Sequence, residues 1–453
     1  MKNLNSISNY NLCCMDSSVN SLFCLLLFSL LICMSCENKK ENGSLVEEDK
    51  SIIVKDAFNK ISNEFLLSDI ADDVEIVPLQ FNAKHVFNRI SKVCVDGNDL
   101  FLAADLSKVL RYNRKGEFLN KIGSLGEGPE EYSHCFGISL DTVSKRVFVA
   151  SGFCAQNEMK SYSYSGNYID SKAVAPKGYC MFGSERNFYD FRQNMHIFRR
   201  MLPLTDGGKD IWLIQMQDTA ANVLSTFYNS ADLGYIDEIN KHSLDWENFN
   251  TGFWTERSPV CSFYKEEINF VFEGNDTIYR YDSKSRKLDC RYILDTGVKH
   301  DIKAERKAVK SYDECLSLRV AGLFETAEYI YVSVEKDVSS FLIRYEKDTG
   351  EVNAIENKGE IMSGGINRTH YRAVDPPGFK NDLCGGLPFY PDFSDGERLI
   401  KVYSPDELIE QVDLKALQNE PVLMPEKKNE LLNLLYSLKN DDNPVVMIIK
   451  LKK

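Results

Sequence analysis

The chain has 453 residues, of which 43% are hydrophobic and 27% are charged, with 54 Lys and Arg against 67 Asp and Glu. That apolar fraction is enough for a packed core and excludes a disordered or low-complexity chain. The formal net charge of −13 argues against a nucleic-acid partner, because phosphate binding needs a basic face. Length alone suggests two or three domains, although a single large all-β domain can also reach this size.

A signal peptide is expected over residues 1–35. Residues 22–32 form an uninterrupted apolar run. This run is shorter than the about 20 residues that cross a bilayer, and it matches the hydrophobic region of a signal peptide. The run is followed by Ser35 and Cys36, and a small residue directly before a cysteine resembles a bacterial lipobox. Cys36 is therefore the predicted lipidation site.

Two alternatives to lipidation stay open. Cys33 and Met34 stand where leucine and alanine are more usual in a lipobox, so the segment could be an ordinary secretory signal with an incidental Cys36. Cys33 and Cys36 also have the spacing of a metal or redox pair. The end of a cleaved hydrophobic region is a poor place for such a pair, which favours lipidation.

Residues 36–51 are predicted to form a flexible tether. Leu45 and Val46 are the only apolar side chains between residues 37 and 51, and a coil of this length spans roughly 20 Å. We therefore expect an exported lipoprotein, held to the bacterial outer membrane by its N-terminal lipid on the periplasmic or the surface side. No later segment is long and apolar enough to span a membrane.

The cysteines after Cys36 have wide and irregular spacing without a CxxC pair, which favours mostly buried free thiols. One or two disulfides among them stay open. The eight positions are Cys94, Cys135, Cys154, Cys180, Cys261, Cys290, Cys315 and Cys384.

A repeating strand unit dominates residues 74–403, where strand-like runs alternate with Gly, Asn and Asp turns. Each copy has an apolar strand, a short gap, a strand ending near Tyr and a polar turn. This period is typical of blade-like β units with insertions. The sequence predicts an all-β, six-bladed β-propeller over residues 52–453, with tandem β-sandwiches as the alternative. Equivalent positions, spaced by about 58 residues on average, are Tyr112, Tyr162, Met216, Tyr281, Tyr345 and Val402.

Ring closure and a helical insertion are predicted near the C-terminus. Residues 74–79 and 445–451 are strand-like, and we expect both in the last blade, because propellers commonly close by pairing strands from opposite chain ends. Between the sixth copy and the last strand, residues 404–439 have helical patterns. Ser404 is placed to cap one helix and Pro425 to open another. These helices are expected to pack on the rim of the last blade.

The chain resembles a family of six-bladed β-propeller lipoproteins from Gram-negative gut anaerobes, whose biochemical role is largely unassigned. Three segments carry the resemblance: residues 116–132, with a Gly-Pro-Glu-Glu-Tyr loop, residues 381–391 and residues 442–451. Cys384 departs from the family pattern, in which Asp is more usual. The resemblance covers most of residues 68–453 and implies the propeller fold, but it implies little about function because such folds host many activities.

Motifs of catalysis are absent from the sequence. Residues 123–128 are rich in glycine, but they lack the lysine of a phosphate loop and lie beside acidic residues, which favours a turn between blades. Residues 96–99 resemble a Ca²⁺ loop and are more typical of a hairpin turn. The six histidines are far apart in the sequence. We predict no metal site and no cofactor.

Two stretches are candidates for ligand binding. Residues 237–258 carry Trp246 and Trp254 among acidic residues, and such aromatic side chains could stack on sugar rings or anchor a partner; packing of the loop onto a blade is the alternative.

The second stretch is residues 381–390, expected beside the central channel, with Asn381, Asp382 and Tyr390 as polar contributors. Its glycines could instead allow close backbone approach. Arg199 and Arg200 are interpreted as a solvated surface pair, with a place at the mouth of the channel as the alternative.

The leading hypothesis is a membrane-anchored binding module for a ligand, with a glycan, peptide or protein as the partner and no catalysis. The alternative is a hydrolase or lyase whose active site lies in the central funnel of the propeller, assembled from several blades.

Overall fold

The computed structural model describes residues 51–81, 84–135, 137–151, 158–173, 188–190, 192–199, 211–235, 259–300, 318–359, 361–364, 368–371 and 374–452. All of them belong to one unit, Ser51–Lys453. The predicted signal peptide, Cys36 and most of the predicted tether lie outside the described residues.

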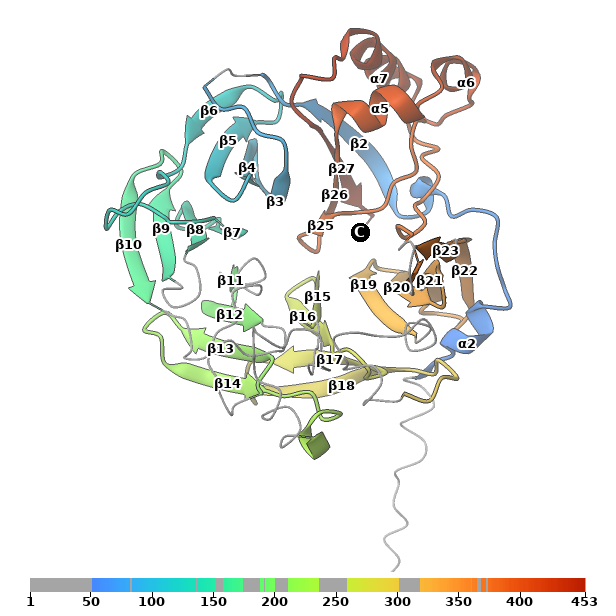
Figure 1. Ribbon diagram of the computed structural model, residues 1–453, viewed down its shortest axis with the longest axis horizontal. Helices are drawn as coiled ribbons and strands as arrows, with labels where there is room; N and C mark the ends of the chain where they lie inside the picture. The colour runs from blue at the N-terminus through green and yellow to red at the C-terminus, as the bar shows by residue number, and fades with distance from the viewer. Residues whose placement is uncertain are drawn as a thin grey trace, which may run out of the picture. The chain divides into compact units, whose positions relative to one another are not determined.

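Six sheets form the blades of a β-propeller, which confirms the predicted fold class (Figure 1). Each blade has four antiparallel strands, and a short fifth strand is added in parallel to the outside of blade 4. The strands are given from the centre outward, which is also their chain order in blades 1 to 5. Blade 1 contains β3 (Ile90–Asp96), β4 (Asp99–Ala104), β5 (Lys108–Asn113) and β6 (Phe118–Lys121). Blade 2 contains β7 (Gly137–Asp141), β8 (Arg146–Ser151), β9 (Glu158–Ser163) and β10 (Tyr168–Ala173). Blade 3 contains β11 (Phe188–Asp190), β12 (Met195–Arg199), β13 (Ile214–Asp218) and β14 (Val223–Phe227).

The second half of the ring has the same plan, with additions. Blade 4 contains β15 (Val260–Tyr264), β16 (Glu267–Val271), β17 (Thr277–Asp282) and β18 (Lys287–Leu294). Blade 5 contains β19 (Arg319–Glu325), β20 (Tyr329–Lys336), β21 (Ser339–Glu346) and β22 (Val352–Asn357). Blade 6 contains β25 (Phe393–Ser394), β26 (Arg398–Tyr403), β27 (Val445–Leu451) and β2 (Ala71–Pro78). A separate hairpin, β23 (Ile361–Gly364) with β24 (Arg368–Tyr371), lies between blades 5 and 6 in the sequence.

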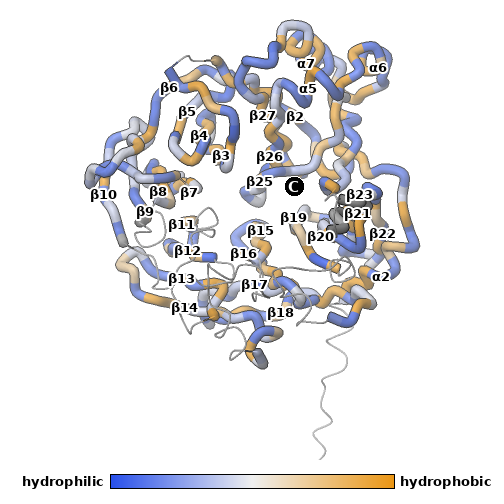
Figure 2. Tube along the Cα trace, in the orientation of Figure 1, coloured by the Kyte–Doolittle hydropathy of each residue, from blue (hydrophilic) through white to orange (hydrophobic). Residues whose placement is uncertain are grey.

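The middle strands are apolar because neighbouring blades cover both of their faces. In β20, five consecutive residues from Ile330 to Val334 are buried, and in β4 the five residues from Leu100 to Ala104 are. The outer strand β18 is mostly exposed or half-buried. Figure 2 shows the same distribution, with hydrophobic stretches within the sheets, as in β26 and β27, and hydrophilic residues at many turns.

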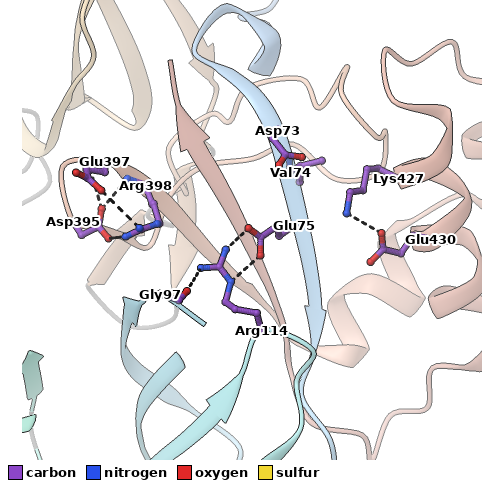
Figure 3. Close-up of polar contacts among 10 residues, drawn as sticks. All are labelled: Asp73, Val74, Glu75, Gly97, Arg114, Asp395, Glu397, Arg398, Lys427 and Glu430. Atoms are coloured by element: carbon purple, nitrogen blue, oxygen red, sulfur yellow. Dashed lines mark hydrogen bonds and ion pairs between the residues drawn. The ribbon is translucent and has the colours of Figure 1, made fainter. Parts of the chain in front are cut away.

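Strands from the two ends of the described unit close the ring in blade 6, as predicted. β2 pairs antiparallel with β27, from Ala71 opposite Leu451 to Pro78 opposite Val445. The seam with blade 1 has an ion pair, in which the Nε of Arg114 donates to a carboxylate oxygen of Glu75 at 2.7 Å (Figure 3). The closure therefore joins a ladder of main-chain hydrogen bonds to a polar contact between blades.

The predicted position of the sixth repeat copy is wrong by one strand. Tyr112, Tyr162, Met216, Tyr281 and Tyr345 all lie on the third strand of a blade, whereas Val402 lies on β26, the second strand of blade 6. The prediction relied on a short sequence spacing between the second and third strands of a blade. In blade 6 the helical insertion lies between these two strands, β26 and β27, so the spacing is much longer there. Residues 387–390, expected as the strand before β26, form only an isolated bridge, between Phe379 and Phe389.

The predicted helical insertion is confirmed between β26 and β27, and it has one more helix than expected. The helices are α5 (Pro405–Gln411), α6 (Leu414–Asn419) and α7 (Pro425–Ser437). The Oγ of Ser404 accepts a hydrogen bond from the main-chain N–H of Glu407 at 3.1 Å, the expected cap. Leu431 and Leu435 of α7 are buried in the same apolar cluster as Val445 and Met447 of β27. The helices thus cover one side of blade 6.

The N-terminal segment runs along the outside of blades 4 and 5 before it enters blade 6. β1 (Ser51–Ile52) pairs in parallel with β18 of blade 4, and the main-chain N–H of Ser62 donates to the carbonyl of Ala354 in blade 5. Ile52 and Val54 are fully buried, and burial of a large aliphatic side chain stabilises a fold by about 1.5–3 kcal/mol. The segment is therefore part of the packed unit from residue 51 onward.

Cys135 and Cys384 are buried free thiols, as expected, and Cys94 and Cys261 are half-buried free thiols. Cys290 is exposed, against the expectation of burial. Cys154, Cys180 and Cys315 lie outside the described residues. Over the described part of the chain, no helix is long and apolar enough to span a membrane.

Candidate functional site

A cavity of about 1020 Å³ lies at the axis of the ring. Residues of all six innermost strands (β3, β7, β11, β15, β19 and β25) line it, which is the region that these strands surround in Figure 1. Clefts of this size hold drug-sized ligands. Since six different segments contribute, the cavity exists only when the ring is closed.

Most acidic side chains in the cavity wall are neutralised by a neighbouring cation. Arg319 forms an ion pair with Glu335, and Arg398 pairs with Asp395 at 2.8 Å in the turn after β25 (Figure 3). Asp96 accepts from the Nζ of Lys145 at 2.6 Å. Such paired groups fix the shape of the wall rather than offering charge to a ligand.

Asp190 of β11 differs from these carboxylates. Its residue is only 4% exposed, its Oδ1 accepts a hydrogen bond from the main-chain N–H of Arg192 at 3.2 Å, and its Oδ2 has no hydrogen-bond partner. Burial raises the pKa of this carboxyl group, and the positive charge of Arg192 opposes the rise. A buried polar atom without a partner costs free energy, so Asp190 is a strained element of the wall.

Three cations in the wall lie over aromatic rings that also line the cavity. The Nζ of Lys92 is 5.2 Å from the centre of the Phe393 ring. The guanidinium carbons of Arg192 and Arg199 are 5.5 Å and 5.7 Å from the ring centres of Phe263 and Phe188. Cation–π contacts of this kind hold a charged group in place without neutralising it.

Two thiols, Cys94 and Cys261, also line the cavity. Burial raises the pKa of each to about 11, partly offset by nearby cations: Lys92 for Cys94, and Arg199 and Lys92 for Cys261. Because the thiolate is the nucleophilic form, neither thiol is activated for catalysis at neutral pH.

Of the predicted ligand-binding residues, Tyr390 lines the cavity and Asn381 and Asp382 do not. The Tyr390 hydroxyl lies against Gly322 of β19, where any Cβ would come within 2.6 Å of it. The Oδ1 of Asn381 accepts from the main-chain N–H of Cys384 at 3.1 Å. The carboxylate of Asp382 accepts two hydrogen bonds from Ser68, from its N–H at 2.9 Å and from its Oγ at 2.5 Å.

The stretch around Asn381 therefore reaches the axis only at its end. Gly385 has φ of +79°, and a Cβ there would meet Leu417 of α6 at 2.5 Å. The glycines of this stretch allow the helical insertion to pack closely against its backbone. This agrees with the alternative that the glycines serve close backbone approach. The approach occurs beside blade 6 and not at the axis.

Trp246 and Trp254, the other predicted binding residues, lie outside the described residues. Residues 123–128 form a loop between blades 1 and 2, in which the Oε2 of Glu131 accepts from the main-chain N–H of Gly128 at 3.0 Å. The Glu131 carboxylate therefore occupies the main-chain N–H that a phosphate loop would offer to its anion. Residues 96–99 form the predicted hairpin turn, with Asp96 opposite Asp99.

Sequence reasoning missed two residues that distinguish the cavity, Asp190 and Lys92. For Arg199 the favoured interpretation, a solvated surface pair, is wrong and the alternative of a place at the channel mouth fits better: Arg199 lines the cavity, and its Nη1 donates to the carbonyl of Pro259 at 2.9 Å. A signal for Asp190 was present, since it is the only charged residue between Phe188 and Phe191. Within the described ranges, no group of three or more His, Cys, Asp or Glu could hold a metal ion.

A protein-family model matches residues 49–450, and its description is a domain of unknown function, DUF4934. The chain belongs to this family. No curated protein matches the chain. The DUF4934 match covers the described propeller up to residue 450, which includes β2 and all but the last residue of β27.

Solved structures support the fold of this DUF4934 chain. A candidate exported protein from Bacteroides fragilis is 13% identical, with a TM-score of 0.55 over 87% of this chain and 98% of that one. The extracellular domain of a candidate hybrid two-component system from B. thetaiotaomicron has a TM-score of 0.36 and 11% identity over 64% of this chain and 30% of that one. A chain of a nidogen–laminin complex has a TM-score of 0.33 and 10% identity, over 62% of this chain and 93% of that one. Only the first TM-score exceeds 0.5, so only that likeness supports the fold.

Proposed function

We propose that the chain is an exported lipoprotein, lipidated at Cys36 and anchored to the outer membrane, whose propeller binds a ligand in its central cavity. The lipobox-like sequence before Cys36 and the polar tether after it support the anchor. The large cavity at the axis supports the binding role. A glycan, a peptide or a segment of a protein partner would each have access to such a site.

The observation that carries this proposal is the unpartnered Oδ2 of Asp190 in the cavity wall. A buried acceptor without a donor destabilises the free protein, and a ligand that donates to it recovers that free energy. Functional sites commonly retain features that lower the stability of the free protein. Asp190 therefore marks the part of the cavity where a ligand would bind.

A hydrolase or lyase at the same place has weaker support. Hydrolases and lyases commonly use a pair of titratable groups next to the substrate, one as acid and one as base. Asp395 and Glu335 of the wall are held in ion pairs with arginine, and the buried thiols are not activated. The isolated acceptor at Asp190 suits recognition better than bond cleavage.

A thermal-shift screen of the purified propeller against glycans and short peptides tests the binding role. We expect at least one compound to raise the melting temperature of the wild type and not of an Asp190→Asn variant. Product analysis of each hit tests the alternative, because turnover would contradict a role limited to binding.

Cell fractionation tests the anchor. We expect the wild-type protein in the membrane fraction and a Cys36→Ala variant in the soluble fraction. Cys33→Ala is the matched control, since it removes a nearby cysteine of the signal segment and should leave the protein in the membrane. Retention of the Cys36→Ala variant in the membrane would show that lipidation at Cys36 is not the anchor.

A further inference from the structure

The side chain of Asp190 faces blade 4. Successive side chains of a strand point to opposite faces, and Tyr189 of β11 faces blade 2, where its ring centre lies 4.2 Å from that of Phe148. Phe188 and Asp190 therefore share the other face of β11, toward β15 of blade 4, the next blade in the ring (Figure 1).

Contacts on both sides of Asp190 place it against β15. The ring centre of Phe188 lies 5.3 Å from that of Phe263 on β15. Beyond Asp190, the Nη1 of Arg192 donates to the main-chain carbonyl of Lys265 at 3.2 Å. Because Asp190 lies between these two contacts, its carboxylate lies beside the middle of β15.

Ser262 is a second unsatisfied group in this part of the wall. It precedes Phe263 on β15, lines the cavity and is 3% exposed. Its Oγ has no hydrogen-bond partner within the described part of the chain. The cavity wall around β15 therefore carries an unsatisfied carboxylate oxygen, that of Asp190, and an unsatisfied hydroxyl group.

Asn269 determines how the Ser262 hydroxyl can be used. It lies directly opposite Ser262 in the β15–β16 ladder, so the two side chains share one face of the sheet. The Oδ1 of Asn269 accepts from the Nη1 of Arg291 at 2.9 Å. A guanidinium group only donates, so the amide cannot be turned around, and its Nδ2 points away from Arg291.

The Nδ2 of Asn269 needs an acceptor. Asn269 is 1% exposed, and this atom has no partner among the described residues. Rotation of Ser262 about χ1 would let its Oγ accept from the Nδ2, which leaves the Ser262 O–H to donate into the cavity. Since the wall then has a donor at Ser262 and an acceptor at Asp190, a ligand needs both an acceptor and a donor.

This requirement selects among the common polar groups. An ammonium group has no acceptor for Ser262, and an ionised carboxylate has no donor for Asp190. An amide has both, but on different atoms and in fixed directions. Each hydroxyl group can turn either to donate or to accept, so a compound with several hydroxyl groups can satisfy both residues from many orientations.

From this arrangement we infer that the central cavity binds an uncharged polyhydroxyl ligand of the sugar class, with one hydroxyl group donating to Asp190 and another accepting from Ser262. The inference rests on the proposed binding function and specifies its ligand class. Free monosaccharides and sugar units of a longer glycan share this chemistry.

Isothermal titration calorimetry with neutral and charged probes tests the inference. The neutral probes are D-glucose, D-galactose and D-mannose, with maltose and lactose to represent longer glycans. D-glucosamine, D-glucuronate and N-acetylglycinamide supply an ammonium, a carboxylate and an amide. We expect a neutral sugar to bind best, with an affinity that salt does not change. Tighter binding of a disaccharide than of its hexoses would indicate a glycan as the source.

Variants of the two wall residues locate the site. Ser262→Ala should weaken binding of the sugar about five- to tenfold, as expected for one lost hydrogen bond. Asp190→Asn should weaken it about tenfold, because a charge-assisted bond becomes a neutral one. Ser161→Ala is the matched control, since Ser161 is fully buried, donates to Asp170 at 2.5 Å and does not line the cavity.

Asn269→Asp tests the positioning role of Asn269. The variant keeps an acceptor for Arg291 but replaces the Nδ2 donor by an acceptor, so the Ser262 hydroxyl would donate to residue 269 instead of the ligand. The affinity should fall as far as in Ser262→Ala, and the double variant should lose nothing more. Independent, additive losses would contradict this role. The melting temperature of each variant checks that it is folded.

The outcomes separate this inference from the proposed function. Preferred binding of the amide or of a charged probe, or an unchanged affinity in Ser262→Ala, would overturn the inferred ligand class and leave a binding cavity. The same holds if no sugar binds at millimolar concentration while a peptide of the thermal-shift screen does. If nothing binds in the cavity in either experiment, both the inference and the proposed function fail.

Discussion

Two buried carboxylates of the propeller, Glu325 and Asp190, have opposite surroundings. Both residues are 4% exposed. Glu325, in blade 5, receives two bonds of 2.8 Å from the guanidinium group of Arg291 and one of 2.6 Å from the Nζ of Lys347. Asp190, in blade 3, has one main-chain donor and a carboxylate oxygen without a partner.

The difference separates a structural role from a binding role. Arg291 comes from blade 4 and Lys347 follows β21, so the Glu325 cluster joins two blades, and every carboxylate oxygen in it is satisfied. Asp190 faces the cavity and joins nothing. Burial alone therefore does not identify a functional carboxylate in this fold; an unsatisfied oxygen next to a cavity does.

The largest expected effect is on the Glu325 cluster. Glu325→Gln keeps the shape but leaves Lys347 without its buried counter-charge and Arg291 with only the longer contact to Glu267. Breaking a buried ion pair in this way typically destabilises a protein by about 3–5 kcal/mol. Urea unfolding should show a lower free energy of unfolding with an unchanged slope. Glu267→Gln is the control, because Glu267 contacts the same Arg291 at 3.4 Å but is 35% exposed, and it should cost less than about 1 kcal/mol. Equal effects of the two variants would contradict the structural role of Glu325.

The next effect has the opposite sign. Asp190→Asn removes a buried charge that no cation neutralises by direct contact through Oδ2. We expect the free energy of unfolding at pH 7 to stay within about 1 kcal/mol of the wild type or to rise by up to about 2 kcal/mol, while ligand binding weakens. A loss as large as that of Glu325→Gln would show that Asp190 has a structural role instead.

The pH dependence of stability sharpens the comparison. Because burial raises the Asp190 pKa above its ordinary value of 3.8, the folded protein binds this proton more tightly than the unfolded chain does. This stabilising contribution is complete below the unfolded pKa and is lost as the pH rises through the folded pKa. Acidification from pH 7 to about pH 4 should therefore stabilise the wild type relative to Asp190→Asn. A stability difference that does not vary with pH would be the contrary result.

The smallest effect is expected at the seam between blades 6 and 1. The pair of Arg114 and Glu75 is more exposed than the Glu325 cluster, with side chains 15% and 41% accessible. Arg114→Met should lower the free energy of unfolding by about 0.5–1 kcal/mol, as measured by urea unfolding in low and in high salt. High salt should reduce the difference, whereas the effect of Glu325→Gln should remain.

The sequence was most informative where strands are buried on both faces. Residues 329–334, on β20, form a largely apolar run, interrupted by Ser333, because blades cover both sides, and such runs revealed the repeat. The closing strand β27 was predictable for the same reason, whereas the outer strand β2 alternates more between buried and exposed residues. The helical insertion was visible from the cap at Ser404, but it displaced the register of the sixth copy because it separates strands that are adjacent elsewhere.

The cavity wall was harder to predict. Innermost strands such as β11 and β25 have three and two residues, and one face of each meets the cavity, so they lack a clear apolar pattern. Lys92 and Asp190 become neighbours of one cavity only when the blades close into a ring. Tyr390 was expected beside the channel and lines the cavity, whereas Asn381 bonds the main chain of Cys384 within its own stretch and Asp382 bonds Ser68 of the N-terminal segment.

The path of the N-terminal segment also determines how the propeller would respond to mechanical force. A pull on residue 51 acts first on the short parallel strand beside β18, and then on the bonds from Ser62 to Ala354 and from Leu67 to Lys380. The β2–β27 ladder, with seven residue pairs, comes after these contacts. Tension would therefore peel the outer contacts one at a time, and the strands that hold the ring closed would be loaded last.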